Sequence, residues 1–172
     1  MFVFGFCGWS GSGKTDLICR IISSLNKKRI SVSTIKHTHH DVTIDKTGKD
    51  SFKHKESGAK EVLFGGGSNW TLIHTGKASY EYQVNDLIKK MSKDNDLIIV
   101  EGFKKSKIPK LEVYNSQRNK TILAKGNDSI VGIVCDKISA EVKGLGIPVF
   151  DFHETEKISN FIIEYKSKNE KK

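Results

Sequence analysis

The hydrophobic pattern at the start of the chain predicts a strand, a helix and a second strand. Residues 2–7 are almost continuously apolar and end at a glycine, as in a strand buried on both faces of a parallel sheet. After a glycine-rich loop, apolar residues recur at helical spacing between positions 17 and 25. Residues 30–36 are β-branched and alternating, which predicts another strand. Such a unit makes the two strands parallel, with a right-handed crossover.

Later segments extend this pattern. Three further apolar runs, each followed by polar residues, predict strands of the same sheet at residues 96–100, 130–135 and 148–152. Two helices are marked by apolar residues at helical spacing, the first over residues 80–91 and the second over residues 158–165. We therefore expect an α/β fold with a mostly parallel central sheet flanked by helices.

A separate signal predicts a β-hairpin. Residues 61–64 and 70–74 are strand-like and flank three consecutive glycines, Gly65 to Gly67. We expect the hairpin to extend from the main sheet. An exposed strand edge is a ready pairing surface, so we also place subunit contacts near these glycines.

The loop after the first strand carries the strongest chemical signal. It matches the pattern GxxxxGK[ST] at every fixed position and lies between a predicted strand and a predicted helix, as this motif requires. The matching residues are Gly8, Trp9, Ser10, Gly11, Ser12, Gly13, Lys14 and Thr15. In such a loop the backbone N–H groups and the helix N-terminus hold phosphates, the lysine bridges the outer phosphates and the hydroxyl binds magnesium. The fold class we expect is therefore the P-loop NTPase fold.

A second acidic group is needed near the end of a neighbouring strand, because Mg²⁺ takes oxygen ligands and an attacking water must be oriented. Glu101 fits this requirement, since it directly follows a buried apolar strand and precedes Gly102. The residue usual at this position is aspartate. Whether Glu101 binds the metal directly, acts through water or orients the nucleophile is left open by the sequence. With Lys14, it is our candidate catalytic residue.

A long polar stretch, residues 37–58, is typical of a functional loop. His37, His39 and His40 could bind a transition metal, but they lack Cys or carboxylate partners at a convincing spacing. The alternative is a switch-like segment in which Asp41 or Asp50 reaches the magnesium. We favour the switch-like segment.

Composition limits the classes of partner. The 172 residues carry a net charge of +9, yet no aromatic-interleaved motif or basic recognition helix points to nucleic acid. The Lys104–Lys110 cluster and the C-terminal lysines are either solvated or attract an acidic partner or an anionic ligand. We expect residues 1–165 to form one P-loop domain and residues 166–172, with four lysines and one glutamate, to be a disordered basic tail.

The cellular setting follows from what the chain lacks. No apolar run approaches the roughly 18 residues needed to cross a bilayer, and the first residues lack a basic signal-peptide region. Three cysteines without a CxxC pair read as free thiols of a reducing compartment: Cys7, Cys19 and Cys135. We expect a cytoplasmic protein with no membrane partner.

Four segments together resemble the molybdopterin-guanine dinucleotide biosynthesis protein B family, and the resemblance covers about residues 1–150. They are the GxSGSGKT loop, KHTHHD, GKDSFKHKESGA and a strand ending in EGFK. The resemblance implies a homodimeric, GTP- and Mg²⁺-binding protein with weak GTPase activity. In that family it assists a MobA-type nucleotidyltransferase, which attaches GMP to molybdopterin. The ligands implied beside GTP are therefore molybdopterin or its guanine dinucleotide. Asp50 lies in the family's GKDS segment and Glu101 in its EGFK segment.

Two other functions stay open. The histidine cluster could belong to a nickel-delivery GTPase, and a small-molecule kinase would use the same loop. The guanine-reading [NT]KxD pattern is absent, because residues 134–137 read VCDK, so the motifs alone do not decide between GTP and ATP. None of the three arginines, Arg20, Arg29 and Arg118, lies in the loop or strand-end motifs, so we expect slow turnover.

Overall fold

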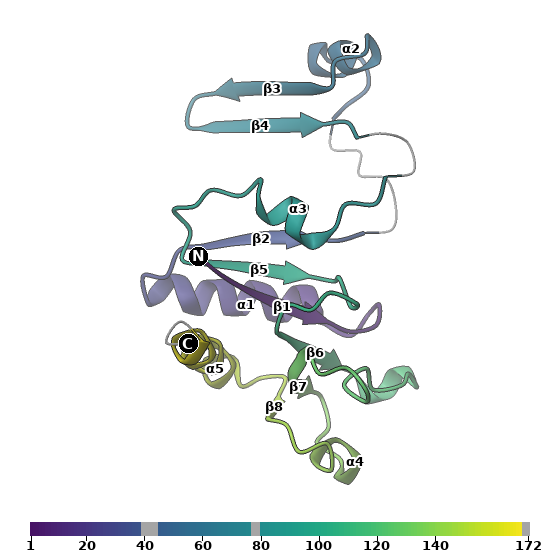
Figure 1. The fold of residues 1–172 in the computed structure, drawn as a ribbon, viewed down its shortest axis with the longest axis vertical. Coiled ribbons are helices and arrows are strands. Elements are labelled where there is room, and N and C mark those ends of the chain that lie inside the picture. The colour runs from purple at the N-terminus through teal and green to yellow at the C-terminus, as the bar shows by residue number, and fades with distance from the viewer. Residues whose placement is uncertain (39–44, 77–79, 170–172) are drawn as a thin grey trace. The chain divides into compact units, whose positions relative to one another are not determined.

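The structure is a computed structural model that describes residues 1–38, 45–76 and 80–169 (Figure 1). The chain divides into two compact units, one of Met1–His37 with Val84–Lys172 and the other of Thr38–Gln83. The single domain expected for residues 1–165 is thus interrupted by the second unit. Each unit is described in turn.

The first unit is built on a six-stranded sheet with the order β2-β5-β1-β6-β7-β8, in which every pair is parallel. The strands are β1 (Phe2–Cys7), β2 (Val32–Lys36), β5 (Leu97–Glu101), β6 (Lys110–Tyr114), β7 (Ile130–Cys135) and β8 (Val149–Asp151). Five of them match strands predicted from the apolar runs, and β6 does not. Because all six run the same way, their carboxyl ends meet at one edge of the sheet, where open α/β sheets bind ligands.

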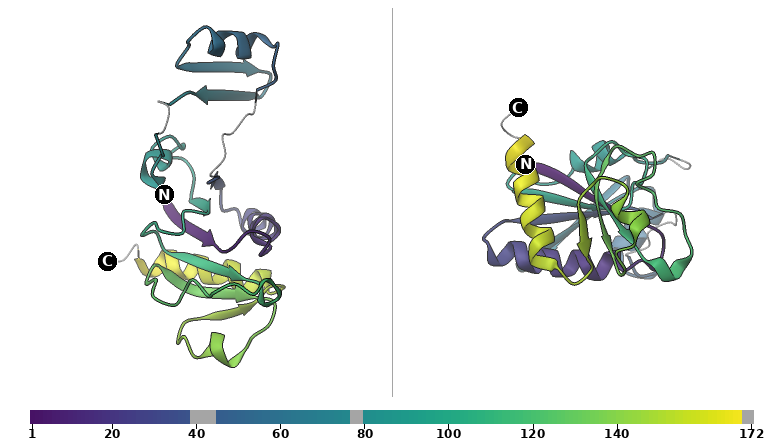
Figure 2. Two further views of the ribbon diagram at one scale, coloured as in Figure 1. Left: turned by 90° about the vertical axis from the view of Figure 1, so that its right-hand side faces the viewer. Right: turned by 90° about the horizontal axis from the view of Figure 1, so that it is seen from below.

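Two long helices cover one face of this sheet, α1 (Lys14–Lys27) and α5 (Thr155–Asn169) (Figure 2). Leu17 and Ile21 of α1 and Ile158 of α5 are fully buried in one cluster with Phe4 and Phe6 of β1. Short α3 (Val84–Ile88) packs on the opposite face with residues of β2 and β5, and α4 (Ala140–Lys143) lies near β7. Helices therefore lie on both faces of the sheet, as the sequence predicts.

Two expected helices differ in length. The helix expected over residues 80–91 is confined to Val84–Ile88. Tyr80 lies before it and packs edge-on against Tyr82, with ring centroids 4.8 Å apart. The expected start of a disordered tail at residue 166 is wrong for residues 166–169. They are the last residues of α5, which meets neither Gly nor Pro before Asn169 and so has no local signal to stop earlier.

The second unit consists of one helix and a hairpin. Helix α2 (Asp50–Glu56) precedes strands β3 (Glu61–Gly66) and β4 (Asn69–His74), which pair antiparallel. The hairpin predicted around Gly65–Gly67 is confirmed. Helix α2 was not predicted, because it buries none of its residues and so has no apolar period.

None of the helices in the described part of the chain combines the length and the hydrophobicity that a membrane span requires.

Candidate nucleotide-binding site

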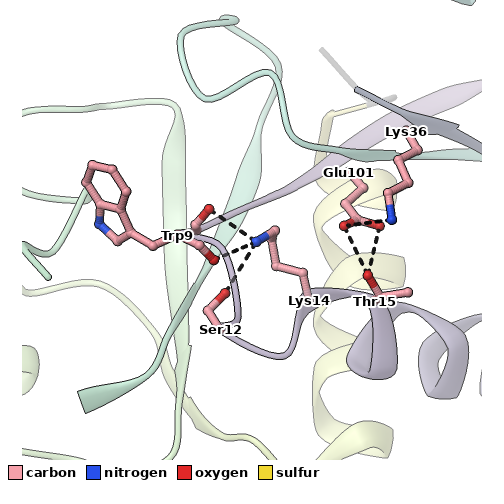
Figure 3. Close-up of polar contacts among 7 residues, drawn as sticks. Trp9, Ser12, Lys14, Thr15, Lys36 and Glu101 are labelled. Carbon is pink, nitrogen blue, oxygen red and sulfur yellow. Dashed lines mark hydrogen bonds and ion pairs between the residues drawn. The ribbon is translucent and has the colours of Figure 1, made fainter. Parts of the chain in front are cut away.

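The glycine-rich loop joins β1 to α1 at the carboxyl edge of the sheet, in the position the sequence predicts (Figure 3). Gly8 has φ 148° and Gly13, which caps α1, has φ 91°. Residues with side chains rarely adopt these angles. A Cβ atom at Gly13 would lie 2.8 Å from the Phe152 ring, so the loop also needs glycine there for space. The first turn of α1 consequently points its N–H groups into the loop.

Lys14 folds back over the loop. Its Nζ donates to the carbonyl oxygens of Trp9 (2.8 Å) and Gly8 (3.2 Å) and to Ser12 Oγ (3.4 Å) (Figure 3). Burial lowers the pKa of Lys14, and the carboxylate of Glu101 partly offsets this by raising it. Within residues 1–38, 45–76 and 80–169 this half-buried ammonium forms no ion pair with a carboxylate, so it is suited to binding an anionic phosphate.

Thr15 and Glu101 are brought together across the sheet edge. Thr15 Oγ1 donates to Glu101 Oε1 (3.2 Å) and Oε2 (3.4 Å), and Lys36 Nζ lies 3.7 Å from Oε1 (Figure 3). A hydroxyl and a carboxylate side by side are hard oxygen ligands of the kind that Mg²⁺ prefers. The donor set therefore fits magnesium. The ion pair with Lys36, from the end of β2, was not anticipated from the sequence.

Asp50 belongs to the second unit, as the first residue of α2. Its side chain is 91% exposed and lies 3.7 Å from Lys53 Nζ. Lys14 and Glu101 belong to the first unit. Its role in nucleotide binding stays a prediction of the family resemblance.

The expected histidine cluster falls largely outside the described residues, since His39, His40 and Asp41 are not among them. His37 follows β2 and stacks on Phe103, with ring centroids 4.3 Å apart. No group of three or more His, Cys, Asp or Glu side chains arranged to hold a metal occurs in residues 1–38, 45–76 and 80–169. The transition-metal hypothesis thus gains no support from these parts of the chain.

Sequence reasoning missed the residues that the other strand ends bring to the loop. Trp9 Nε1 donates to the Thr121 carbonyl (2.9 Å), and Lys104 Nζ lies 4.0 Å from the centre of the Trp9 ring. The guanidinium of Arg118, in the segment after β6, lies against Gly11. Recognising β6 would have placed this segment at the nucleotide edge of the sheet.

Glu112 anchors that segment. It lies in β6, is completely buried and accepts hydrogen bonds from the backbone N–H groups of Leu123 and Ala124, both at 2.8 Å. Burial raises the pKa of Glu112, although the two backbone hydrogen bonds partly offset the rise. The segment from β6 to β7 is thus fixed to the sheet through a buried carboxyl group.

We expect Glu112 to make stability depend on pH. Its pKa is raised in the folded state above the ordinary 4.5, so the folded protein keeps this proton to a higher pH than the unfolded chain. Stability from this group is therefore lost as pH rises from about 4.5 through the folded-state pKa. Urea unfolding from pH 4.5 to 7.5 should show this loss in the unmodified protein and not in Glu112→Gln. Parallel pH profiles for the two proteins would contradict it.

A family model described as molybdopterin guanine dinucleotide synthesis protein B matches residues 3–136. The chain belongs to this family. The match covers β1, the glycine loop, the hairpin unit and the strands up to β7, so the resemblance drawn from the sequence motifs is confirmed. Membership of the MobB family and the P-loop fold together imply nucleotide binding.

Curated relatives agree. This MobB family member is 37% identical over 122 residues to the molybdopterin-guanine dinucleotide biosynthesis adapter protein of Haemophilus influenzae, covering 70% of this chain and 67% of the relative. It is 29% identical over 168 residues to the protein of the same name from Escherichia coli strain K12, covering 96% and 94% of the two chains.

Solved structures share the fold. A molybdopterin-guanine biosynthesis protein B superposes with a TM-score of 0.74 at 24% identity, over 95% of this chain and 99% of the other. The MobB of Bacillus subtilis gives a TM-score of 0.73 at 20% identity, over 95% and 97%. At these identities the likeness establishes the α/β P-loop fold and its hairpin.

Proposed function

We propose that this MobB family member is a GTP-binding adapter with slow GTPase activity in the biosynthesis of molybdopterin guanine dinucleotide. In this role it assists the nucleotidyltransferase that attaches GMP to molybdopterin, and it contacts molybdopterin or its guanine dinucleotide. The relatives' names supply the pathway. The observation that carries the nucleotide part is the phosphate-binding loop, with the Lys14 ammonium held at its mouth by backbone carbonyls.

Each loop residue has a role in this proposal. The phosphates lie against backbone N–H groups of the loop, and Lys14 neutralises their charge. The backbone residues are Gly8, Ser10, Gly11, Ser12 and Gly13. Thr15 and Glu101 hold Mg²⁺, which supplies Lewis-acid stabilisation of phosphate charge when bound. Asp50, in the GKDS segment, is a further candidate nucleotide-binding residue.

Slow turnover is consistent with the position of Glu101. Its carboxylate oxygens already contact the Thr15 hydroxyl and lie near the Lys36 ammonium. This geometry suits a residue that helps to hold a metal better than a base that deprotonates an attacking water. The main function of the site is therefore to hold a nucleotide, and a partner protein recognises the nucleotide-bound protein.

Calorimetric titration with Mg²⁺ plus GTP, and in parallel with Mg²⁺ plus ATP, tests the proposal. We expect GTP to bind more tightly than ATP, with phosphate release on the order of the 10⁻⁴ to 10⁻² s⁻¹ of unassisted GTPases. Tighter binding of ATP would refute the proposal that the bound nucleotide carries guanine. Transfer of phosphate to a small-molecule acceptor rather than water would favour a kinase instead.

The adapter role has its own test. GMP transfer to molybdopterin by the partner nucleotidyltransferase should be faster with this protein and GTP present than without the protein. The Lys14→Ala variant should give no stimulation, because it lacks the phosphate contact. Equal stimulation by Lys14→Ala would show that nucleotide binding is not part of the adapter role.

The hairpin supports self-association. Leu63 pairs with Leu72 across the two strands, and Trp70 lies two residues along on the same face. These side chains are 64%, 43% and 69% exposed, whereas Val62, on the other face, is buried. A cluster of exposed apolar side chains on one sheet face is typical of a protein–protein contact. We propose that it forms the contact between the subunits of a homodimer.

The Leu63→Ser, Leu72→Ser double variant should sediment as a monomer at micromolar concentration, whereas the unmodified protein sediments as a dimer. Two solvent-exposed leucines are lost, so the hairpin itself should persist. Ile138→Ser, which removes an exposed apolar side chain from the first unit, is the control and should leave the dimer intact. A dimer in the double variant, or a monomer in the unmodified protein, would contradict the proposed interface.

A further inference from the structure

Arg118 lies against the phosphate-binding loop although 107 residues separate it from Gly11 in the sequence (118 − 11). A Cβ atom built on Gly11 would lie 2.7 Å from Arg118 Nη2, 2.9 Å from Cζ and 3.2 Å from Nε. The guanidinium therefore lies directly against the middle of the loop. A side chain at position 11 would have to displace this guanidinium.

The Arg118 guanidinium has no ion pair or hydrogen bond within residues 1–38, 45–76 and 80–169. Arg20 is different, because it pairs with Asp16 (3.1 Å) and donates to the carbonyl of Phe152 (2.9 Å). An arginine carries five N–H donors in a planar fork that fits a phosphate bidentately. Those of Arg118 are available to a ligand at the loop.

The segment that carries Arg118 is fixed in place at several points. Glu112 accepts hydrogen bonds from Leu123 and Ala124 at its far end, and Trp9 of the loop donates to the Thr121 carbonyl. At its near end, the Ser116 N–H (2.8 Å) and hydroxyl (2.9 Å) both donate to Asp136. These contacts fix the backbone on both sides of Arg118 beside the loop, and its exposed guanidinium can turn toward a bound anion.

Positive charge also accumulates around this part of the loop. Lys104 and Lys120 lie 4.0 and 5.7 Å from the centre of the Trp9 ring, and Lys14 donates to the Trp9 carbonyl. The charge of Lys104 is close enough to contribute to the lowered pKa of Lys14. Like charges gathered in this way repel one another, and a bound polyanion relieves that repulsion.

We propose that Arg118 is a phosphate-binding residue of the nucleotide site and contacts a phosphate group of the bound nucleotide beside Lys14. The proposal rests on the function proposed above and adds a residue from outside the sequence motifs. It also assigns a purpose to the buried Glu112 carboxyl group, which positions the segment and does not touch the ligand.

The test compares Arg118→Gln and Arg118→Lys with Arg29→Gln, a control that removes the same charge just after the C-terminal end of α1. Affinities for Mg²⁺-GTP and for inorganic tripolyphosphate are measured by titration, and folding is checked by thermal unfolding. Losing a charge-assisted hydrogen bond should weaken both ligands roughly tenfold or more in Arg118→Gln. Arg118→Lys should retain part of the affinity, and Arg29→Gln all of it.

Three outcomes separate this proposal from the proposed function. Unchanged GTP affinity in both folded Arg118 variants would overturn the role of Arg118 and leave nucleotide binding intact. A loss of GTP affinity without a loss of tripolyphosphate affinity would place Arg118 on the nucleoside, and so overturn the phosphate contact. Failure of the unmodified protein to bind any nucleotide would overturn both proposals together.

Discussion

Replacing Lys14 by alanine is expected to weaken nucleotide binding roughly a hundredfold while leaving the fold intact. The Lys14 ammonium is half-buried at the loop, and truncating one partner of a desolvated charge pair costs about 2–5 kcal/mol of binding free energy. Its present partners are two backbone carbonyls and Ser12 Oγ, all neutral. The free energy of unfolding should therefore change by no more than about 1 kcal/mol.

Lys27→Ala is the matched control, because it removes an exposed lysine from the last turn of the same helix. Titration with Mg²⁺-GTP should give the unmodified affinity for this control, and urea unfolding should give similar stabilities for all three proteins. If a folded Lys14→Ala variant keeps its affinity for GTP, Lys14 does not bind the phosphates.

Replacing Gly8 by alanine is expected to damage stability and nucleotide binding together. The new Cβ would lie 2.4 Å from the backbone oxygen of Val113 in β6, and φ at Gly8 is 148°. A backbone atom of a central strand cannot move aside cheaply. Strain of about 1–3 kcal/mol from the dihedral angle and about 1–3 kcal/mol from overpacking together predict a loss of roughly 2–6 kcal/mol.

Gly126→Ala separates these two causes. Gly126 also has a positive φ, 82°, but a Cβ there would meet no atom within 4 Å. The Gly126→Ala variant should lose only the free energy of unfolding that the dihedral strain costs, and none of the GTP affinity. Chemical denaturation of both variants measures the difference, and equal losses would show that the contact with Val113 contributes nothing.

Local patterns in the sequence were sufficient to predict much of the fold. Strands β1 and β7 match their predicted bounds because continuous apolar runs bounded by glycine or polar residues have few other interpretations. The glycine loop and the hairpin were predictable for a similar reason, since their glycines stand in fixed relation to strand-like neighbours.

Strand β6 shows where local patterns fail. Two of its residues, Lys110 and Glu112, are charged in sequence yet completely buried in the structure. They are tolerated because other groups satisfy them: the Ser106 carbonyl and the Ser129 hydroxyl for the lysine, and two backbone N–H groups for the glutamate. No local pattern encodes such partners, so the segment reads as a basic loop.

The candidate site divides in the same way. Lys14, Thr15 and Glu101 were predictable because a motif and a strand end specify them. Arg118 was not, because its approach to Gly11 depends on β6 pairing with β1. The sequence indicates the candidate residues of the loop and strand end, while the order of the strands decides what surrounds them.

The central claim is that backbone amides of the loop and the Lys14 ammonium grip the phosphates of a nucleotide. A crystal structure of the protein with Mg²⁺ and a non-hydrolysable GTP analogue tests it most directly. We predict phosphate oxygens within hydrogen-bond distance of the loop N–H groups and of Lys14 Nζ, which exchanges its bonds to the Gly8 and Trp9 carbonyls for phosphate. An analogue bound elsewhere, with Lys14 still donating to those two carbonyls, would contradict the account.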